Sequence, residues 1–388
     1  MQSHYNINNT DTISRLMIPV SICTFNIENL YMRYKVFDYR TGDRFKRKIL
    51  TAKELREKGG FLPSYEMKNL FRIYDKDSWR KLTARAIKGY GDFRARGRGP
   101  DDKKLPDILC LVEVDSMDAL RLFNEKYLDS HYDYAILIDG NDPRRIDVGL
   151  LSKYKIKSIS TNIYEPYEKT EGSRGSTTIT TTTSSKRKYL FSRDCLIVEV
   201  EIPGADKILT LFLNHLKSKL VFEKEDAAKK AKEEKEANEL REAQARKVAE
   251  FVRKRFSGDL FDKEDFVVLG DFNDTPDSLY LKKLVKELGM VDVISSSFKR
   301  KEDRWTYYWA GENAVTQIDY ILLSPHLAKN STKLPYIERR GISNARKTSH
   351  LDSNDGDKIP FDFKRFPQVS NKMEASDHCP VFLDLMVS

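Results

Sequence analysis

The chain has 388 residues, of which 40% are hydrophobic and 33% are charged, and its formal net charge is +9. No apolar run approaches the roughly 20 residues that a helix needs to cross a bilayer, so we do not expect a membrane protein. Because the polar first 15 residues lack a basic start followed by an apolar stretch, we expect a cytoplasmic protein without a secretory signal.

Short apolar runs separated by polar turns predict the strands of the N-terminal half. Strands are expected at 18–25, 107–112, 132–138 and 148–151, and a helix at 118–128. Residues 33–104 contain 22 Lys and Arg against 10 Asp and Glu, so the positive charge of the chain is concentrated there. Such a segment favours a polyanionic partner such as DNA, RNA or an anionic membrane, although a solvated loop explains the charge equally well.

The C-terminal half combines further strands with one long charged helix. Strands are expected at 195–202, 208–213, 265–269, 306–309, 318–323 and 381–385. A shorter helix is expected at 278–288. The long helix over 222–256 has no large apolar residue between Phe222 and Asn238, so its first half should project into solvent. A Ser/Thr-rich stretch at 172–188 should be a surface loop, and 341–372 is an irregular basic insertion. Many strands with sparse helices predict an α+β protein with a two-sheet sandwich and outer helices.

The four cysteines indicate a reduced core. Cys23, Cys110, Cys195 and Cys379 each lie in or beside an apolar run, and no two of them form a CxxC motif. We therefore expect four buried thiols, as is common for free cysteine in cytoplasmic proteins, and no zinc or redox site built from them.

Polar side chains recur where the predicted strands begin or end. They are Asn26, Glu28, Glu113, Asn214, His215, Asp271, Asn273, Asp274, Asp319, Asp377 and His378. Strand ends are where a rigid sheet presents a side chain to a cleft. Carboxylate and amide oxygens suit Mg²⁺, Mn²⁺ or Ca²⁺, and histidine beside a carboxylate suits acid–base work near neutral pH. A single carboxylate after a strand is more often a cap or surface group, so the ordered set carries the prediction.

The ordered motifs FNIEN, LVE, DVGLLSKY, SRD, NHLKS, GDFNDTPDS, QIDYILLS and SDHCPV resemble the exonuclease–endonuclease–phosphatase superfamily. They extend from Asn26 to Pro380, which favours a single catalytic domain over 16–388 after a polar tail at 1–15. In that case 33–104, 172–188, 222–256 and 341–372 are elaborations of one domain. The resemblance implies a four-layer α/β sandwich, in which two packed mixed β-sheets have helices on both outer sides.

The resemblance also implies a role for each motif residue. The implied ligands of Mg²⁺, Mn²⁺ or Ca²⁺ are Asn26, Glu28, Glu113 and Asp377. The implied catalytic residues are His215, Asp271, Asn273, Asp319 and His378. The implied phosphate contacts are Arg193, Asn214 and Lys217. In this scheme His378, oriented by Asp319, is the general base or polarises the phosphate, Asp271 orients the attacking water, and Asn273 binds a phosphoryl oxygen.

Three functions are compatible with this pattern. A nuclease acting on DNA or RNA is favoured, because aromatic residues interleave with the charges of the basic segment and could stack on bases. A sphingomyelinase-like or inositol-phosphatase-like phosphoesterase is the alternative, and it lacks support from any apolar hairpin suited to membrane insertion. A catalytically inactive nucleic-acid-binding module is the third, although every expected polar position is filled. The sequence identifies no protein partner.

Overall fold

The computed structural model describes residues 17–31, 77–98, 105–142, 144–167, 189–219, 226–310, 312, 314–331, 334–342, 350–353, 358–360 and 375–388. The predicted loop at 172–188 lies outside these residues, as do the greater parts of 33–104 and 341–372. Within the described residues, no helix combines the length and apolar character needed to cross a membrane.

Two six-stranded mixed sheets form the centre of the molecule. The first has the order β13 (Tyr336–Ile337), β16 (Val381–Val387), β1 (Ile18–Leu30), β2 (Ile108–Val114), β4 (Asp147–Ser152) and β3 (Tyr134–Leu137). The second has the order β5 (Ile156–Ser160), β6 (Cys195–Glu201), β7 (Ile208–His215), β8 (Phe266–Asp271), β12 (Asp319–Leu323) and β9 (Val291–Asp292). Each sheet contains one parallel pair, β1 with β2 and β7 with β8, and its other pairs are antiparallel.

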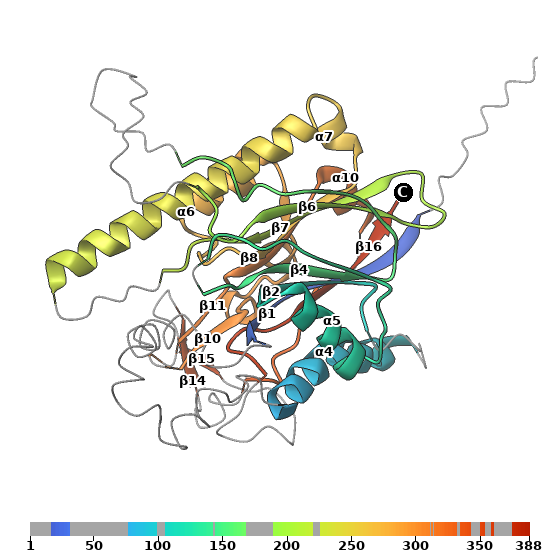
Figure 1. The fold of residues 1–388 in the computed structure, drawn as a ribbon, viewed down its shortest axis with the longest axis horizontal. Helices are drawn as coiled ribbons and strands as arrows, with labels where there is room; N and C mark the ends of the chain where they lie inside the picture. Colours follow the sequence, from blue (N-terminus) through green and yellow to red (C-terminus); the bar gives the residue numbers. More distant parts are fainter. Residues whose placement is uncertain are drawn as a thin grey trace, which may run out of the picture.

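Helices cover the outer faces of both sheets, so the molecule has four layers (Figure 1). Helices α4 (Asp77–Arg98) and α5 (Met117–Tyr127) lie outside the first sheet. Helix α6 (Ala227–Arg255), with α8 (Leu279–Lys282) and the π-helix η2 (Lys283–Glu287), lies outside the second. The remaining short elements are α7 (Leu260–Lys263), α9 (Val293–Ser297), η3 (Lys301–Asp303) and α10 (Pro325–Asn330). The predicted four-layer sandwich is therefore confirmed.

A small third sheet lies beside the sandwich (Figure 1). Its order is β10 (Tyr307–Trp309), β11 (Ala314–Thr316), β14 (His350–Ser353) and β15 (Lys358–Pro360). A bridge between Tyr307 and His378 connects β10 to the segment that precedes β16. Of these strands the sequence predicted β10 alone, because the other three have no clear apolar alternation.

The alternation of side chains along the strands builds the core between the two sheets. Every second residue of each central strand is buried in this inter-sheet core, as Ile22, Leu213, Leu269 and Ile321 illustrate. The intervening residues face the outer helices. Truncating such a side chain to alanine costs about 2–5 kcal/mol of stability, because neighbouring atoms fill the resulting cavity only in part. All four cysteines are buried and unpaired, as predicted.

The long helix divides as its sequence pattern predicts. Asp226 caps the N-terminus of α6 by accepting hydrogen bonds from the backbone N–H groups of Ala228 and Lys229. Residues 227–236 are exposed, and in Figure 1 this end of the helix extends past the strands. The buried face in the second half includes Leu240, Gln244, Val248 and Val252, which pack against the second sheet.

The end of the basic segment is part of the outer helical layer. Helix α4 buries Leu82, Ile87 and Tyr90 against the first sheet, and the Tyr90 ring stacks on Phe382 at 5.1 Å. The buried Arg80 donates from Nη2 to the backbone oxygen of Asn29 (2.8 Å), within the polar end of β1. Helix α4, the described part of 33–104, therefore contributes to the core and stabilises the end of β1.

Candidate active site

Four predicted site residues occupy the end of the inter-sheet core. Asn26, His215, Asp271 and Asp319 continue the alternation of the buried apolar residues in β1, β7, β8 and β12, and all four are buried. Register places Asp271 opposite both His215 on β7 and Asp319 on β12. Because strand alternation has a period of two, these polar groups face the same space as the core that precedes them.

Two irregular strand ends bring further side chains toward this space. Glu113 has φ +68°, and the pairing of β2 shifts register between Val112 and Val114. Val112 faces the inter-sheet core, whereas Val114 faces the outer helices, so the alternation changes phase at Glu113. Glu28, at the end of β1, has φ +50° and stands in a similar register shift. Bulges with left-handed residues commonly redirect a side chain beside a functional site.

The centre of the site is a hydrogen-bonded group formed by three strands and the segment before β16. The ring Nδ1 of His378 lies 2.9 Å from Asp319 Oδ2, which also accepts a bond from the Thr306 hydroxyl (2.7 Å). Asp271 Oδ2 accepts a bond from Asn26 Nδ2 (3.0 Å), and the same amide nitrogen lies 3.3 Å from His378 Nε2. The chain thus brings together residues separated by up to 352 positions.

Asn273 and His215 complete this group on the side of the second sheet. Asp271 accepts bonds from the backbone N–H (2.8 Å) and the Nδ2 (3.1 Å) of Asn273, whose φ is +52°. Nε2 of His215 lies 3.6 Å from Asp271 Oδ2 and 4.0 Å from Glu113 Oε1. His215 Nδ1 is buried and has no hydrogen-bond partner among the described residues. Nε2 therefore faces the two carboxylates.

The two histidines have opposite electrostatic environments. Burial, followed by the positive charges of Arg193 and Arg144, lowers the pKa of His215 well below its usual value, so this ring is neutral near pH 7. Burial also disfavours the charged form of His378, but the carboxylates of Asp319 and Asp271 outweigh it and raise its pKa well above 6.5. The site thus pairs a neutral imidazole with a cationic one.

Further carboxylates gather around His378 and Tyr307. Among the described residues, Glu113 has no ion pair with a Lys or Arg side chain. Partial burial raises the pKa of Asp377. The positive charge of His378 lowers this pKa in part, whereas the negative charge of Glu113 raises it further. Burial raises the pKa of Tyr307, and the charges of Asp377, Asp271, Glu28 and Glu113 raise it further. This concentration of negative charge is what a divalent cation would neutralise, and the oxygen donors suit Mg²⁺ or Mn²⁺.

A second set of donors is less suited to a metal. One ligand atom each of Asp271, Asp319 and His378 lies within 4.8 Å of the others. These atoms, however, already take part in the hydrogen bonds with Asn26, Asn273 and Thr306 described above. A metal bound there would have to break several of those bonds, so the Glu113 side of the site is the better fit.

Arg193 lies behind the site in a buried ion pair. It is 4% exposed, and its Nη1 donates to Asp142 Oδ2 at 2.7 Å, while its Nη2 donates to the Leu216 carbonyl at 2.8 Å. Asp142 also accepts bonds from the backbone N–H (2.8 Å) and Nε (3.4 Å) of Arg144. The Arg144 side chain is 32% exposed, and its charge interacts with that of Glu113. Of the two arginines that contact Asp142, Arg144 therefore has the more accessible side chain, and Arg193 is buried.

The other two predicted phosphate contacts differ in their positions. The positive charge of Lys217 contributes to the lowered pKa of His215, which places it near the site. Asn214 is not brought to the group. It faces away from His215 along β7, on the side of Phe212, and its Nδ2 donates to the Phe212 carbonyl at 3.0 Å. Strand alternation is the reason, because neighbouring residues point to opposite faces.

Three residues of this site were not anticipated from the sequence. Thr306 bonds Asp319, Arg144 lies beside Glu113, and the Tyr307 ring packs on the His378 ring with centroids 4.7 Å apart. The Thr306–Trp309 run has the apolar pattern of an ordinary strand, so nothing in it marks a site. The Arg144-Arg145 pair, which Ile146 separates from the strand Asp147–Ser152, was a usable signal, because a basic turn at a strand end suits an anion.

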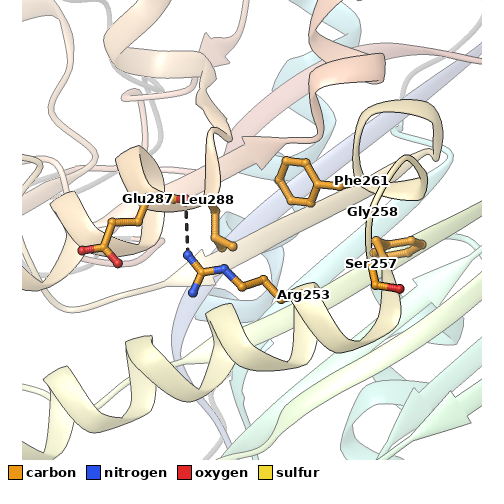
Figure 2. A pocket seen from close by; sticks show the side chains of 7 residues that line it. Arg253, Ser257, Gly258, Phe261, Glu287 and Leu288 are labelled. Atoms are coloured by element: carbon orange, nitrogen blue, oxygen red, sulfur yellow. Dashed lines mark hydrogen bonds between the residues drawn. The ribbon is translucent and has the colours of Figure 1, made fainter.

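The described residues also line two surface hollows away from these groups. One, of about 340 Å³, lies between the end of α6 and η2, and Figure 2 shows Arg253 extending toward the backbone of Glu287, to which it donates a hydrogen bond (3.3 Å). The other, of about 580 Å³, lies at the opposite end of the strands and includes Tyr134, Tyr154 and Lys207. Neither hollow is lined by a candidate site residue.

Comparison with known proteins gives one family match. The model of the endonuclease/exonuclease/phosphatase family matches residues 24–378. No curated protein sequence matches the chain. Similar solved structures include a truncated TDP2 from Caenorhabditis elegans, with 14% identity, coverage of 95% of this chain and 98% of that one, and a TM-score of 0.47. The human nocturnin catalytic domain with bound sulfate has 13% identity, 95% coverage of both chains and a TM-score of 0.48. Beta toxin 275-280 from Staphylococcus aureus has 14% identity, 95% and 100% coverage, and a TM-score of 0.47.

Proposed function

The chain belongs to the endonuclease/exonuclease/phosphatase family of phosphoester hydrolases, and we propose that it cleaves phosphodiester bonds of nucleic acid with the help of a divalent metal ion. The observation that carries this proposal is the convergence of Glu113, Asp271 and His378 at one end of the inter-sheet core. In this group Glu113 is suited to bind a cation, Asp271 is suited to position water, and His378 supplies a charged imidazole.

The carboxylates of Glu113 and Asp377, with Glu28 and Asn26 nearby, would bind Mg²⁺ or Mn²⁺. When bound, the ion supplies positive charge that stabilises the negative charge developing on the phosphoryl oxygens. Amide and carboxylate oxygens at the ends of two neighbouring strands are suitable for this purpose, because their positions are fixed by the sheet.

The polar centre is suited to positioning a water molecule for in-line attack. Burial raises the pKa of Asp271 to about 7, with His378 opposing the shift and Asp319 adding to it, so this group can exchange a proton near neutral pH. Asn26 and Asn273 hold its carboxylate by hydrogen bonds from their Nδ2 atoms. A fixed carboxylate of this kind can orient the water and accept its proton.

The two histidines would hold the phosphate from opposite sides. The cationic His378 can donate from Nε2 to a phosphoryl oxygen, because Asp319 holds Nδ1 on the other side of the ring. The neutral His215 can donate or accept at Nε2. Arg144 and Lys217 add positive charge near the same space, while Arg193 is buried in its pair with Asp142 and supports them.

The choice of nucleic acid rests on the charge of the chain. The excess of 12 positive charges in residues 33–104 favours a polyanion. Residues 77–98 of this segment form α4, which contacts the backbone beside Glu28 through Arg80. The described part of the basic segment thus contacts the strand end that carries Glu28, and we take this as support for a long anionic substrate.

A screen of substrates with and without metal tests the proposal. We expect cleavage of plasmid or single-stranded DNA, or of RNA, with Mg²⁺ or Mn²⁺, and no cleavage with EDTA. Glu113→Ala and His378→Ala should each reduce kcat by about 10³-fold or more while the protein stays folded. Cleavage of choline phospholipids or inositol phosphates, but of no nucleic acid, would refute the nuclease assignment. Cleavage of no phosphoester with any divalent ion would favour a binding role.

A further inference from the structure

Helix α6 carries a buried charge that the proposed chemistry does not use. Arg241 is 1% exposed and heads the largest fully buried side chains of the described residues. Arginine is rarely buried completely, because removing its charge from water costs free energy unless every donor finds a partner. A buried arginine therefore needs a structural explanation in its surroundings.

The guanidinium of Arg241 reaches the segments that follow β7 and β8. Its Nη1 donates to the Lys217 carbonyl (3.0 Å), and its Nε donates to Asp274 Oδ2 (3.3 Å). Its Nη2 donates to Asn238 Oδ1 on the same helix. Gln244, three residues further along α6, accepts a bond from the Lys217 backbone N–H (2.8 Å). Side chains of helix α6 thus form hydrogen bonds with both the backbone N–H and the backbone carbonyl of Lys217.

These two segments carry groups of the candidate active site. The Leu216 carbonyl, next to Lys217, accepts bonds from Arg193 Nη2 (2.8 Å) and Asn273 Nδ2 (3.1 Å). Asp274 directly follows Asn273, and its carbonyl accepts a bond from the Tyr320 hydroxyl (2.8 Å), one residue from Asp319. One guanidinium therefore connects the backbone after His215 with the Asp274 carboxylate in the segment after Asp271.

We propose that Arg241 is a positioning residue, whose guanidinium joins the Leu216–Lys219 and Asn273–Thr275 segments and so fixes Asn273 and Arg193 relative to the substrate. This inference rests on the proposed function, since it concerns the same site. Lysine cannot replace it, because a planar fork can bond two segments at once whereas an ammonium is a compact point charge.

The test compares Arg241→Lys and Arg241→Met with a control, Arg246→Met, on the same helix. Arg246 is largely exposed and pairs with Glu242, so its removal leaves the two segments unaffected. Amide hydrogen exchange is measured in all three variants and the wild type, together with kcat and KM on the phosphodiester that the wild type cleaves. Arg241→Lys retains the charge and keeps the test valid if Arg241→Met does not fold.

We expect both Arg241 variants to exchange faster in the two segments, with exchange in β1 and β2 unchanged. A displacement of about 1 Å at a reacting group can cost on the order of 100-fold in rate. We therefore expect kcat to fall about 10- to 100-fold with KM changed less than about twofold, and Arg246→Met to behave as the wild type. Wild-type exchange and kcat in Arg241→Lys would overturn the proposal, as would faster exchange spread evenly over the chain.

The two proposals fail in different ways. If the wild type cleaves no phosphodiester, the proposed function is refuted, and the exchange rates of the two segments still decide whether Arg241 holds them. If the wild type is active and the segments exchange normally without Arg241, the positioning role alone is refuted.

Discussion

Replacing Asp319 by asparagine should lower the pKa of His378 in the metal-free protein. Asp319 Oδ2 lies 2.9 Å from His378 Nδ1 and accepts a second bond from Thr306. A hydrogen bond to a charged group contributes about 1.5–3 kcal/mol, so its loss should lower the pKa by roughly 1–2 units. The carboxylate of Asp271, which lies 3.9 Å from the other ring nitrogen, still raises the pKa of His378 in this variant, so part of the increase remains.

The same substitution should change how stability depends on pH. The folded-state pKa of His378 is raised, so protonation adds stability that is complete below the unfolded-state value of about 6.5 and is lost as pH rises through the folded-state value. Asp319→Asn reduces this contribution. Its effect on the free energy of unfolding should therefore be larger near pH 6 than near pH 10, by about 1.4 kcal/mol for each unit of pKa lost.

Nuclear magnetic resonance titration of the His378 ring and denaturant unfolding at the two pH values provide the measurements. Asp384→Asn is the control, because it removes a buried carboxylate that accepts a bond from Tyr90 away from the site. It should leave the His378 titration unchanged. The reasoning is refuted if His378 titrates in Asp319→Asn as in the wild type, or if the loss of stability is the same at both pH values.

Three further predictions address the strand ends and the substrate. Gly270→Ala should destabilise the protein by about 2 kcal/mol or more in denaturant unfolding, because Gly270 has φ +129° and an added Cβ would lie 1.9 Å from the Asn214 carbonyl oxygen; wild-type stability would contradict this. Tyr307→Phe should keep most activity and Tyr307→Ala should lose about tenfold in kcat, since the ring packs on His378; equal losses in both would assign the effect to the hydroxyl. Arg144→Gln should raise KM and flatten the salt dependence of nucleic-acid binding by about one phosphate contact, whereas an unchanged salt slope would remove Arg144 from the substrate interface.

The sequence predicted most of the central strands and the polar residues at their ends. Strand alternation alone places His215 two residues beyond Leu213 and Asp271 two residues beyond Leu269, on the same side as the core. The long helix α6 was predicted with its exposed and buried halves. The short strands β5, β9, β11, β13, β14 and β15 were missed, because they show no clear alternation or continuous run of apolar residues.

The local pattern of residues determined which chemical groups stand at the strand ends, because side-chain direction follows from backbone periodicity. Only the tertiary structure decided which of these groups meet. The left-handed turn at Glu113 reverses the alternation of β2, and Arg193 is enclosed by Asp142 instead of being presented openly. Tyr307 and Arg241 enter from segments whose sequence resembles ordinary strand and helix. Contacts between residues hundreds of positions apart depend on how the sheets and helices pack, and no local pattern in the chain records that packing.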